Sequence, residues 1–149
     1  MDQKKVLERL ERLCARAEHC SADIYRKALK ALEGDEAAAS QVVRKLTEEK
    51  YVDDARYAGA FVREKSALTG WGPVKIRYAL RAKGISASVV DEALKEAEGN
   101  ASQVRLEKLL RTKYRSLQGD PACKLKLLRF ALGRGYTYDQ VAPLVEKIV

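Results

Sequence analysis

Few residues of this chain have the types and spacing that catalysis requires. The single histidine, His19, lies in a charged amphipathic segment together with Cys14, Glu18 and Cys20. A Ser–His or Cys–His nucleophile pair would have to use His19, because the chain has no other imidazole. As metal ligands, these side chains would not converge on one helical face, whereas a zinc site needs four convergent ligands. We therefore predict that the chain is not an enzyme and that it holds no catalytic residue, metal or cofactor.

Two further motifs have residues that suit a metal or phosphate site but also have a simpler explanation. Asp53 and Asp54 could bind Mg²⁺ as a carboxylate pair, although a helix cap and an ion pair with Arg56 explain them with fewer assumptions. The glycines of "GWGPVKI" (Gly70–Ile76) precede a predicted helix but follow another helix, whereas a dinucleotide-binding loop follows a strand. We therefore predict capping and turn roles for these motifs.

The segment with the clearest potential for binding is "GWGPVKIRYALRAKGI", from Gly70 to Ile85. At 100° per residue, Ile76, Ala79 and Leu80 share one inward stripe of a helix. Arg77 and Arg81 then lie on the opposite face, one turn apart, where like charges repel each other. No acid on that helix offsets them, so the pattern predicts an anionic partner.

Basic residues are concentrated towards the end of the chain. Residues 99–149 carry a net charge of +6, out of +8 for the whole chain. Such an excess favours a polyanionic partner, although a protein can also be basic without binding one. Tyr78 and Tyr114 lie among the cations, where aromatic rings can stack on bases or fit a protein groove. The predicted contact residues, which could line one face of the molecule, are Lys75, Arg77, Tyr78, Arg81, Lys83, Arg111, Lys113, Arg115, Lys124, Lys126, Arg129 and Arg134.

An internal repeat determines the predicted fold. An Ala–Leu pair recurs at residues 28–29, 79–80 and 131–132, each time after a longer helical segment and before an apolar cluster that opens another helix. Because one such unit cannot bury its apolar face alone, neighbouring units should stack. The pattern predicts an all-α fold of tandem three-helix repeats, with about nine helices in an elongated, curved molecule. The predicted modules are residues 1–50, 51–98 and 99–149.

Local signals mark several helix ends within this pattern. Pro73 suits the first turn of a helix, Gly84 suits a left-handed C-cap, and Ser86 suits the next N-cap. Trp71 lies between two glycines and could either pack into the helix corner or stand exposed as a contact. The aromatic residues that we expect to pack in cores or at module junctions are Tyr51, Tyr57, Phe61, Phe130 and Tyr136.

Three segments, in this order and spacing, resemble the RecX family of RecA regulators. They are "YVDDARYAGAFV" (Tyr51–Val62), "GWGPVKIRYALRAKGIS" (Gly70–Ser86) and "KLLRFALGRGYTYDQV" (Lys126–Val141). The first fifty residues match the family pattern less well, because Ile24 and Ala28 stand where an acidic and a basic residue are usual. The resemblance therefore covers roughly residues 51–149.

The resemblance implies both a fold and a function. Members of the family are tandem three-helix repeats that bind in the helical groove of the RecA filament on single-stranded DNA. It implies a regulator, mainly an inhibitor, of the filament's ATPase, strand-exchange and co-protease activities in DNA repair, homologous recombination and the SOS response. Some members also bind DNA weakly. The alternatives are a recombinase-independent DNA-binding protein, since short helix pairs can mimic a helix-turn-helix motif, and a helical-repeat adaptor for an acidic protein.

The sequence also favours a cytoplasmic monomer that does not contact membranes. Its first residues form a charged, amphipathic segment, unlike a signal peptide, and no apolar run approaches the ~20 residues that span a bilayer. Cys14, Cys20 and Cys123 are odd in number and lack CxxC spacing, so we expect no disulfide framework.

Overall fold

The computed structural model describes residues 2–97 and 100–149, and within these ranges every regular element is a helix. In chain order these nine helices are α1 (Gln3–Arg16), α2 (Ser21–Ala31), α3 (Glu36–Glu48), α4 (Asp54–Ala67), α5 (Pro73–Ala82), α6 (Ala87–Ala97), α7 (Asn100–Ser116), α8 (Cys123–Gly133) and α9 (Tyr138–Ile148). The predicted all-α fold of about nine helices is confirmed.

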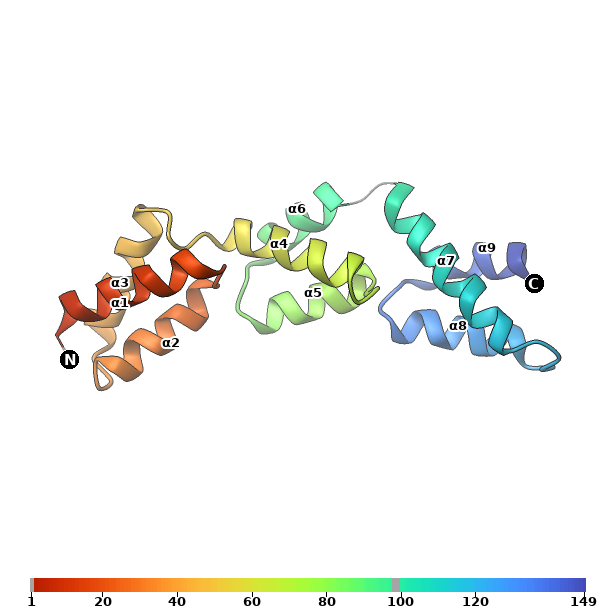
Figure 1. The fold of residues 1–149 in the computed structure, drawn as a ribbon, viewed down its shortest axis with the longest axis horizontal. Helices are drawn as coiled ribbons and strands as arrows, with labels where there is room; N and C mark the ends of the chain where they lie inside the picture. The colour runs from red at the N-terminus through yellow and green to blue at the C-terminus, as the bar shows by residue number, and fades with distance from the viewer. Residues whose placement is uncertain (1, 98–99) are drawn as a thin grey trace.

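The helices form three bundles that follow one another along the molecule: α1–α3, α4–α6 and α7–α9 (Figure 1). The two termini lie at opposite ends of this elongated, slightly bowed row. The most extensive helix packing joins α4 to α6, α2 to α3 and α8 to α9, so each bundle folds mainly on itself. The molecule is therefore the elongated helical repeat that the sequence predicts.

Each bundle has its own hydrophobic core, and its middle helix contributes a pair of buried residues one turn apart. These pairs are Ile24 and Ala28 in α2, Ile76 and Leu80 in α5, and Leu127 and Ala131 in α8. In addition, α8 buries Cys123, whereas Ala79, which the sequence places on the inward stripe of α5, is only partly buried. The Ala–Leu repeat therefore marks the correct helices, but position 28 corresponds to position 80 and not to 79. In the second copy, the predicted alignment of the repeats is therefore wrong by one residue. That alignment pairs residues of the same type, whereas burial follows the period of the helix.

The predicted helix ends are confirmed at four places. Asp53 is the N-cap of α4, and its carboxylate accepts a hydrogen bond from the backbone N–H of Arg56 at 3.1 Å. Pro73 occupies the first turn of α5, and Gly84, with φ +83°, follows the end of that helix. The hydroxyl of Ser86 accepts a hydrogen bond, at 3.4 Å, from a backbone N–H in the first turn of α6.

Most of the aromatic residues pack as expected. Tyr51 packs against the first core, Tyr57 and Phe61 pack against the second, and Tyr136 is buried in the third. Tyr114, which the sequence offers as a partner contact, instead packs against the third core. Its helix position turns it inward, although its neighbours in the chain are cations.

The predicted module boundaries stay predictions. The boundary between residues 98 and 99 lies outside the described residues. At the earlier boundary, Val52 is buried in the core of the first bundle, and α4 begins two residues later at Asp54. In the described ranges, no helix combines the length and the hydropathy that crossing a membrane requires.

Candidate functional site

The turn between α4 and α5 docks directly onto the turn between α8 and α9. The backbone N–H of Gly72 donates to the carbonyl of Arg134 at 2.7 Å, and that of Val74 donates to the carbonyl of Gly135 at 2.8 Å. Gly135 has φ +97°, and a Cβ there would lie 2.3 Å from the Cβ of Lys75. Only glycine combines this conformation with so close an approach. The second and third bundles are thus joined through their backbones.

A cavity of about 610 Å³ opens beside this junction, between the end of α4, one face of α7 and the end of α8. Its cationic lining residues are Arg105, Lys108, Lys113 and Arg134. Its hydroxyl-bearing lining residues are Ser66, Thr69, Thr112 and Ser116, and none of the described lining residues is acidic. Lysine, arginine and free hydroxyl groups donate to phosphate oxygens, and the cations also bind carboxylates. The hydroxyls of Thr69 and Ser116 already donate to backbone carbonyls of their own helical turns, whereas the structure shows no such bond for Ser66 and Thr112. The cavity is therefore suited to an anionic group.

Two of the four cations are held around the ring of Phe130. Lys113 Nζ lies 5.5 Å from the ring centre, and the guanidinium carbon of Arg134 lies 5.2 Å from it. Arg134 Nη1 also donates to the carbonyl oxygen of Thr69 at 2.9 Å. Contact with the ring positions both charges without neutralising them. Phe130 lies beside the junction of the second and third bundles and lines this cavity, and it is not among the described residues of the third core.

Comparison with known proteins identifies the family. Residues 53–94 match the family model described as RecX, second three-helix domain. A Pseudomonas putida protein named Regulatory protein RecX is 32% identical over 134 residues, which are 89% of this chain and 84% of that protein.

The chain belongs to the RecX family of regulatory proteins. A Clostridium tetani protein of the same name is 31% identical over 77% of this chain, which spans about half of that relative's length (54%). The crystal structure of RecX from Lactobacillus salivarius has the same fold, with a TM-score of 0.87. That match covers 98% of this chain and 96% of the other at 20% identity.

In this RecX-family chain, the two arginines of α5 have partners within their own bundle. Arg77 forms an ion pair with Asp91 of α6, and Arg81 Nη1 donates to the carbonyl oxygen of Ile85 at 2.7 Å. These partners lie outside α5, so neighbouring segments supply Arg77 with an acid and Arg81 with a carbonyl, and the two arginines do not require an external anion. Tyr78, on the same helix, is 79% exposed.

Lys75 and Lys83 contact other parts of the chain at the two ends of α5. Lys75 Nζ lies 4.6 Å from the centre of the Trp71 ring. Trp71 also packs edge-on against Phe61, with 6.3 Å between ring centres, and this decides its role in favour of packing. Lys83 Nζ forms an ion pair with Asp23 of α2 at 3.1 Å, which links the second bundle to the first.

The other predicted contacts of the third bundle divide into paired and unpaired cations. The pairs are Arg111 with Glu107, Lys124 with Glu146, and Lys126 with Asp120. The hydrogen bond from Lys126 lowers the pKa of Asp120, so this acid stays charged. Arg115 and Arg129 are exposed, and neither forms an ion pair with any acid in the described part of the chain.

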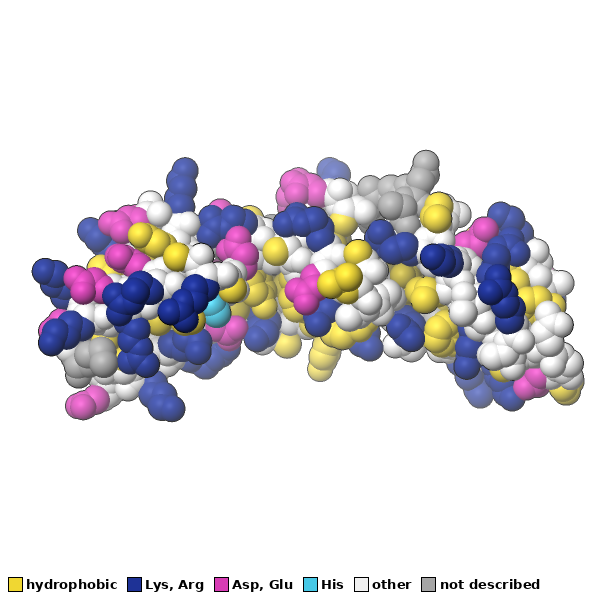
Figure 2. Space-filling view, viewed as in Figure 1, with side chains coloured by type: hydrophobic (Ala, Val, Ile, Leu, Met, Phe, Trp, Pro, Cys, Tyr) yellow, Lys and Arg dark blue, Asp and Glu magenta, His cyan; other side chains and the backbone are white. Residues whose placement is uncertain are grey.

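Of the twelve predicted residues, the structure brings Lys113 and Arg134 together in one cavity. It adds Arg105 and Lys108, which are not among the predicted contacts. They could have been found from the sequence, because the α7 residues of the lining recur every three or four positions from 105 to 116 on one helical face. Figure 2 shows Lys and Arg side chains over all three bundles, including a dense group over the first. On this face the cations do not form one continuous stripe.

Proposed function

We propose that this protein regulates a RecA recombinase, mainly as an inhibitor, by binding in the groove of the RecA filament on single-stranded DNA. It lowers the ATPase, strand-exchange and co-protease activities of the filament. Membership of the RecX family supports the regulatory role. The observation that carries the binding role is the cavity between the second and third bundles, where four cations and four hydroxyls meet without an acid in the described lining.

The shape of the molecule supports a mechanism that is steric and electrostatic. An elongated row of three bundles can contact several protomers along a groove, and linked contacts raise the overall affinity (Figure 1). A rod that bridges protomers opposes the movements that ATP turnover requires and obstructs an incoming duplex. The attraction between cations and an anionic groove speeds binding and weakens with added salt. No catalytic residue of the protein itself is needed.

We place the cavity cations first among the contacts with the filament, and the exposed Tyr78, Arg115 and Arg129 next. The remaining predicted residues stay candidates, although Arg77 and Lys126 would each have to exchange an internal ion pair for an external one. Exposed ion pairs contribute only about 0–1 kcal/mol, so this exchange opposes binding weakly. We further propose that the protein acts as a monomer in the cytoplasm.

A titration of RecA ATPase activity tests the proposal directly. Purified protein is added to RecA, single-stranded DNA and ATP, and we expect ATP hydrolysis and strand exchange to fall as the protein co-sediments with the filament. Unchanged hydrolysis and strand exchange at equimolar protein, without co-sedimentation, would overturn the proposal.

A matched pair of variants tests the role of the cavity. Arg105→Gln combined with Lys108→Gln removes two cavity charges, and we expect filament affinity to fall about tenfold. Arg44→Gln combined with Lys95→Gln removes the same charge from exposed positions outside the cavity and should change affinity little. Equal losses of filament affinity in the two double variants would show that binding depends on the net charge of the protein and not on the cavity.

The hydroxyl groups of the cavity favour a second candidate function, which is binding DNA without a recombinase. Cations together with serine and threonine are typical contacts of the sugar–phosphate backbone. Fluorescence anisotropy with a labelled single-stranded oligonucleotide, in the absence of RecA, separates the two functions. Tight binding at physiological salt with a steep salt dependence would favour this candidate, whereas weak binding would leave RecA as the partner.

A further inference from the structure

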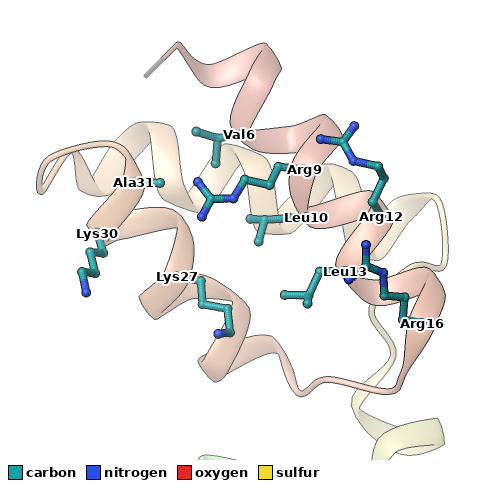
Figure 3. Close-up of a pocket in the computed structure, with 9 residues that line it drawn as sticks. All are labelled: Val6, Arg9, Leu10, Arg12, Leu13, Arg16, Lys27, Lys30 and Ala31. Atoms are coloured by element: carbon teal, nitrogen blue, oxygen red, sulfur yellow. The ribbon is translucent and has the colours of Figure 1, made fainter.

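A second basic surface lies in the first bundle, well separated along the chain from the cavity described above. A groove of about 680 Å³ runs between α1 and α2 (Figure 3). Its floor is apolar, and its rim carries cations on both sides, from Arg9, Arg12 and Arg16 on α1 and from Lys27 and Lys30 on α2. The bundle as a whole is nearly neutral, with a net charge of +1 over residues 1–50, so the groove concentrates positive charge on one face.

The spacing of the cations follows from the two helices. Arg9, Arg12 and Arg16 recur every three or four residues and therefore share one face of α1. Lys27 and Lys30 are three residues apart on α2 and face them across the groove. Within the described ranges, none of these five cations forms an ion pair with an acid. Their charges are available to a partner.

The floor of the groove distinguishes this surface from a nucleic-acid site. It is made of Val6, Leu10, Leu13 and Ala31, of which the first two belong to the core of the bundle. None of the described residues that line the groove carries a hydroxyl group or an aromatic ring, in contrast to the cavity beside α7. A phosphate backbone would meet the cations but leave the partly exposed Leu13 and Ala31 uncovered, and unpaired bases would find no ring on which to stack.

We propose that this groove binds an acidic, amphipathic helical segment of a protein partner. The apolar stripe of such a helix would cover Leu13 and Ala31, which are partly exposed, while carboxylates on its flanks would meet the arginines of α1 and the lysines of α2. Helix-in-groove recognition uses this combination of apolar anchors and flanking charges. Since α1 has 14 residues and is about 21 Å long, the groove accommodates three to four turns of a partner helix. This site goes beyond the proposed function, because it does not use the cavity between the other two bundles.

A labelled model peptide tests the proposal with the full-length protein. The peptide has 14 residues, with leucine at helix positions i, i+3, i+4 and i+7 and glutamate elsewhere. We expect saturable binding by fluorescence anisotropy and a gain of peptide helicity by circular dichroism. A scrambled peptide of the same composition, whose leucines do not share a face, should bind at least about tenfold more weakly, because it cannot cover the apolar floor.

Variants of the rim locate the binding site. Arg9→Glu combined with Lys27→Glu should weaken peptide binding at least about tenfold, while Arg44→Glu combined with Lys95→Glu, outside the groove, should have little effect. Circular dichroism of each variant confirms that it folds. Equal binding of the scrambled peptide, or unchanged binding by the rim variant, would overturn the proposal. A single-stranded oligonucleotide that binds more tightly than the peptide at the same rim residues would also overturn the proposal.

Discussion

The two junctions of this molecule are built from different kinds of contact. Between the first and second bundles, the carboxylate of Asp54 accepts hydrogen bonds from the backbone N–H and the hydroxyl of Ser21, both at 2.7 Å. Between the second and third bundles, the backbone N–H groups of Gly72 and Val74 donate to carbonyls of the α8–α9 turn. The first junction depends on side chains. The second depends mainly on backbone that approaches backbone, with one side-chain hydrogen bond from Arg134 to the carbonyl of Thr69.

The first junction contains further side-chain contacts. Arg56 forms its ion pair with Glu18, at 2.5 Å, and not with Asp53 or Asp54 as expected. Cys20 precedes α2 but is fully buried in the core of the second bundle. Burial raises the pKa of its thiol, so the thiol stays protonated and packs as an apolar group.

This difference determines how each junction can fail. Contacts between charged side chains can shift slightly without breaking, but they respond to pH and salt. A contact between two backbones does not titrate, but it excludes every side chain larger than glycine. We therefore expect the second junction to be sensitive to a single methyl group and the first to be sensitive to protonation.

We expect the largest loss of stability for Gly135→Ala. A Cβ at this position lies 2.3 Å from the Cβ of Lys75 and 2.7 Å from its backbone nitrogen, and φ is +97°. Strain of this kind amounts to about 1–3 kcal/mol, and the clash adds to it, so we expect the free energy of unfolding to fall by at least about 2 kcal/mol. Small-angle X-ray scattering should also show a changed separation of the last two bundles.

Gly133→Ala provides the control for this experiment. It lies two residues away at the end of α8, and a Cβ there meets nothing within 4 Å. Because alanine favours a helix over glycine, this change should leave stability unchanged or raise it by up to about 1 kcal/mol. Similar losses in both variants would mean that the backbone contact at Gly135 does not hold the junction.

A smaller loss is expected for Asp54→Ala at the first junction. It removes two hydrogen bonds to a carboxylate, and we expect urea unfolding to report a loss of about 1–2 kcal/mol. Asp53→Asn removes the same charge next to it but keeps an N-cap acceptor for α4, so its effect should be a few tenths of a kcal/mol. If Asp53→Asn destabilised the protein more than Asp54→Ala, the capping residue would matter more than the junction contact.

We expect the smallest contribution to stability, and one that depends on pH, from the ion pair between Asp23 and Lys83. Burial alone would raise the pKa of Asp23, but hydrogen bonds from Lys83 and Cys20 outweigh it and lower the pKa below the usual 3.8. The hydrogen bond to Asp23 raises the pKa of Lys83 above 10.5. The stabilisation from Asp23 is therefore complete above pH 3.8 and is lost as the pH falls through its lower, folded-state pKa. That from Lys83 is complete below pH 10.5 and is lost as the pH rises through its higher, folded-state pKa.

Asp23→Asn measures this contribution. Both groups are partly exposed, so at pH 7 we expect the variant to be less stable by no more than about 1 kcal/mol. The difference between the variant and the native protein should shrink as the pH falls below 3.8, and it should vanish below the lower, folded-state pKa of Asp23, where this residue is protonated in both the folded and the unfolded chain. A difference that stays constant from pH 7 to pH 2 would show that the ion pair does not contribute through charge.

Much of the fold could be predicted from the sequence, because its signals are local. The cap at Asp53, the proline at the start of α5 and the glycine after its end each act within a few residues of their position. The buried pair Ile76 and Leu80 follows directly from the period of the helix. The alignment of the repeats was harder to predict, because either residue of an Ala–Leu pair can be the one that faces inward.

The candidate site was harder to predict, because it depends on residues far apart in the chain. Arg77 meets Asp91 from the next helix, and Arg134 meets Thr69 from another bundle. A list of cations cannot show which of them have such partners. The groove between α1 and α2 could not be predicted for a related reason. Acids elsewhere in the first bundle offset the charge of its cations, so the net charge of residues 1–50 does not reveal them.

The sequence by itself determined nine helices, most of their ends and the triple repeat, since helix period and capping act over a few residues. Tertiary structure alone decided which cations are paired, where two glycines let two backbones meet, and where unpaired cations surround an apolar floor. These features require segments distant in the chain to lie within a few ångströms of each other, and no local pattern encodes that distance.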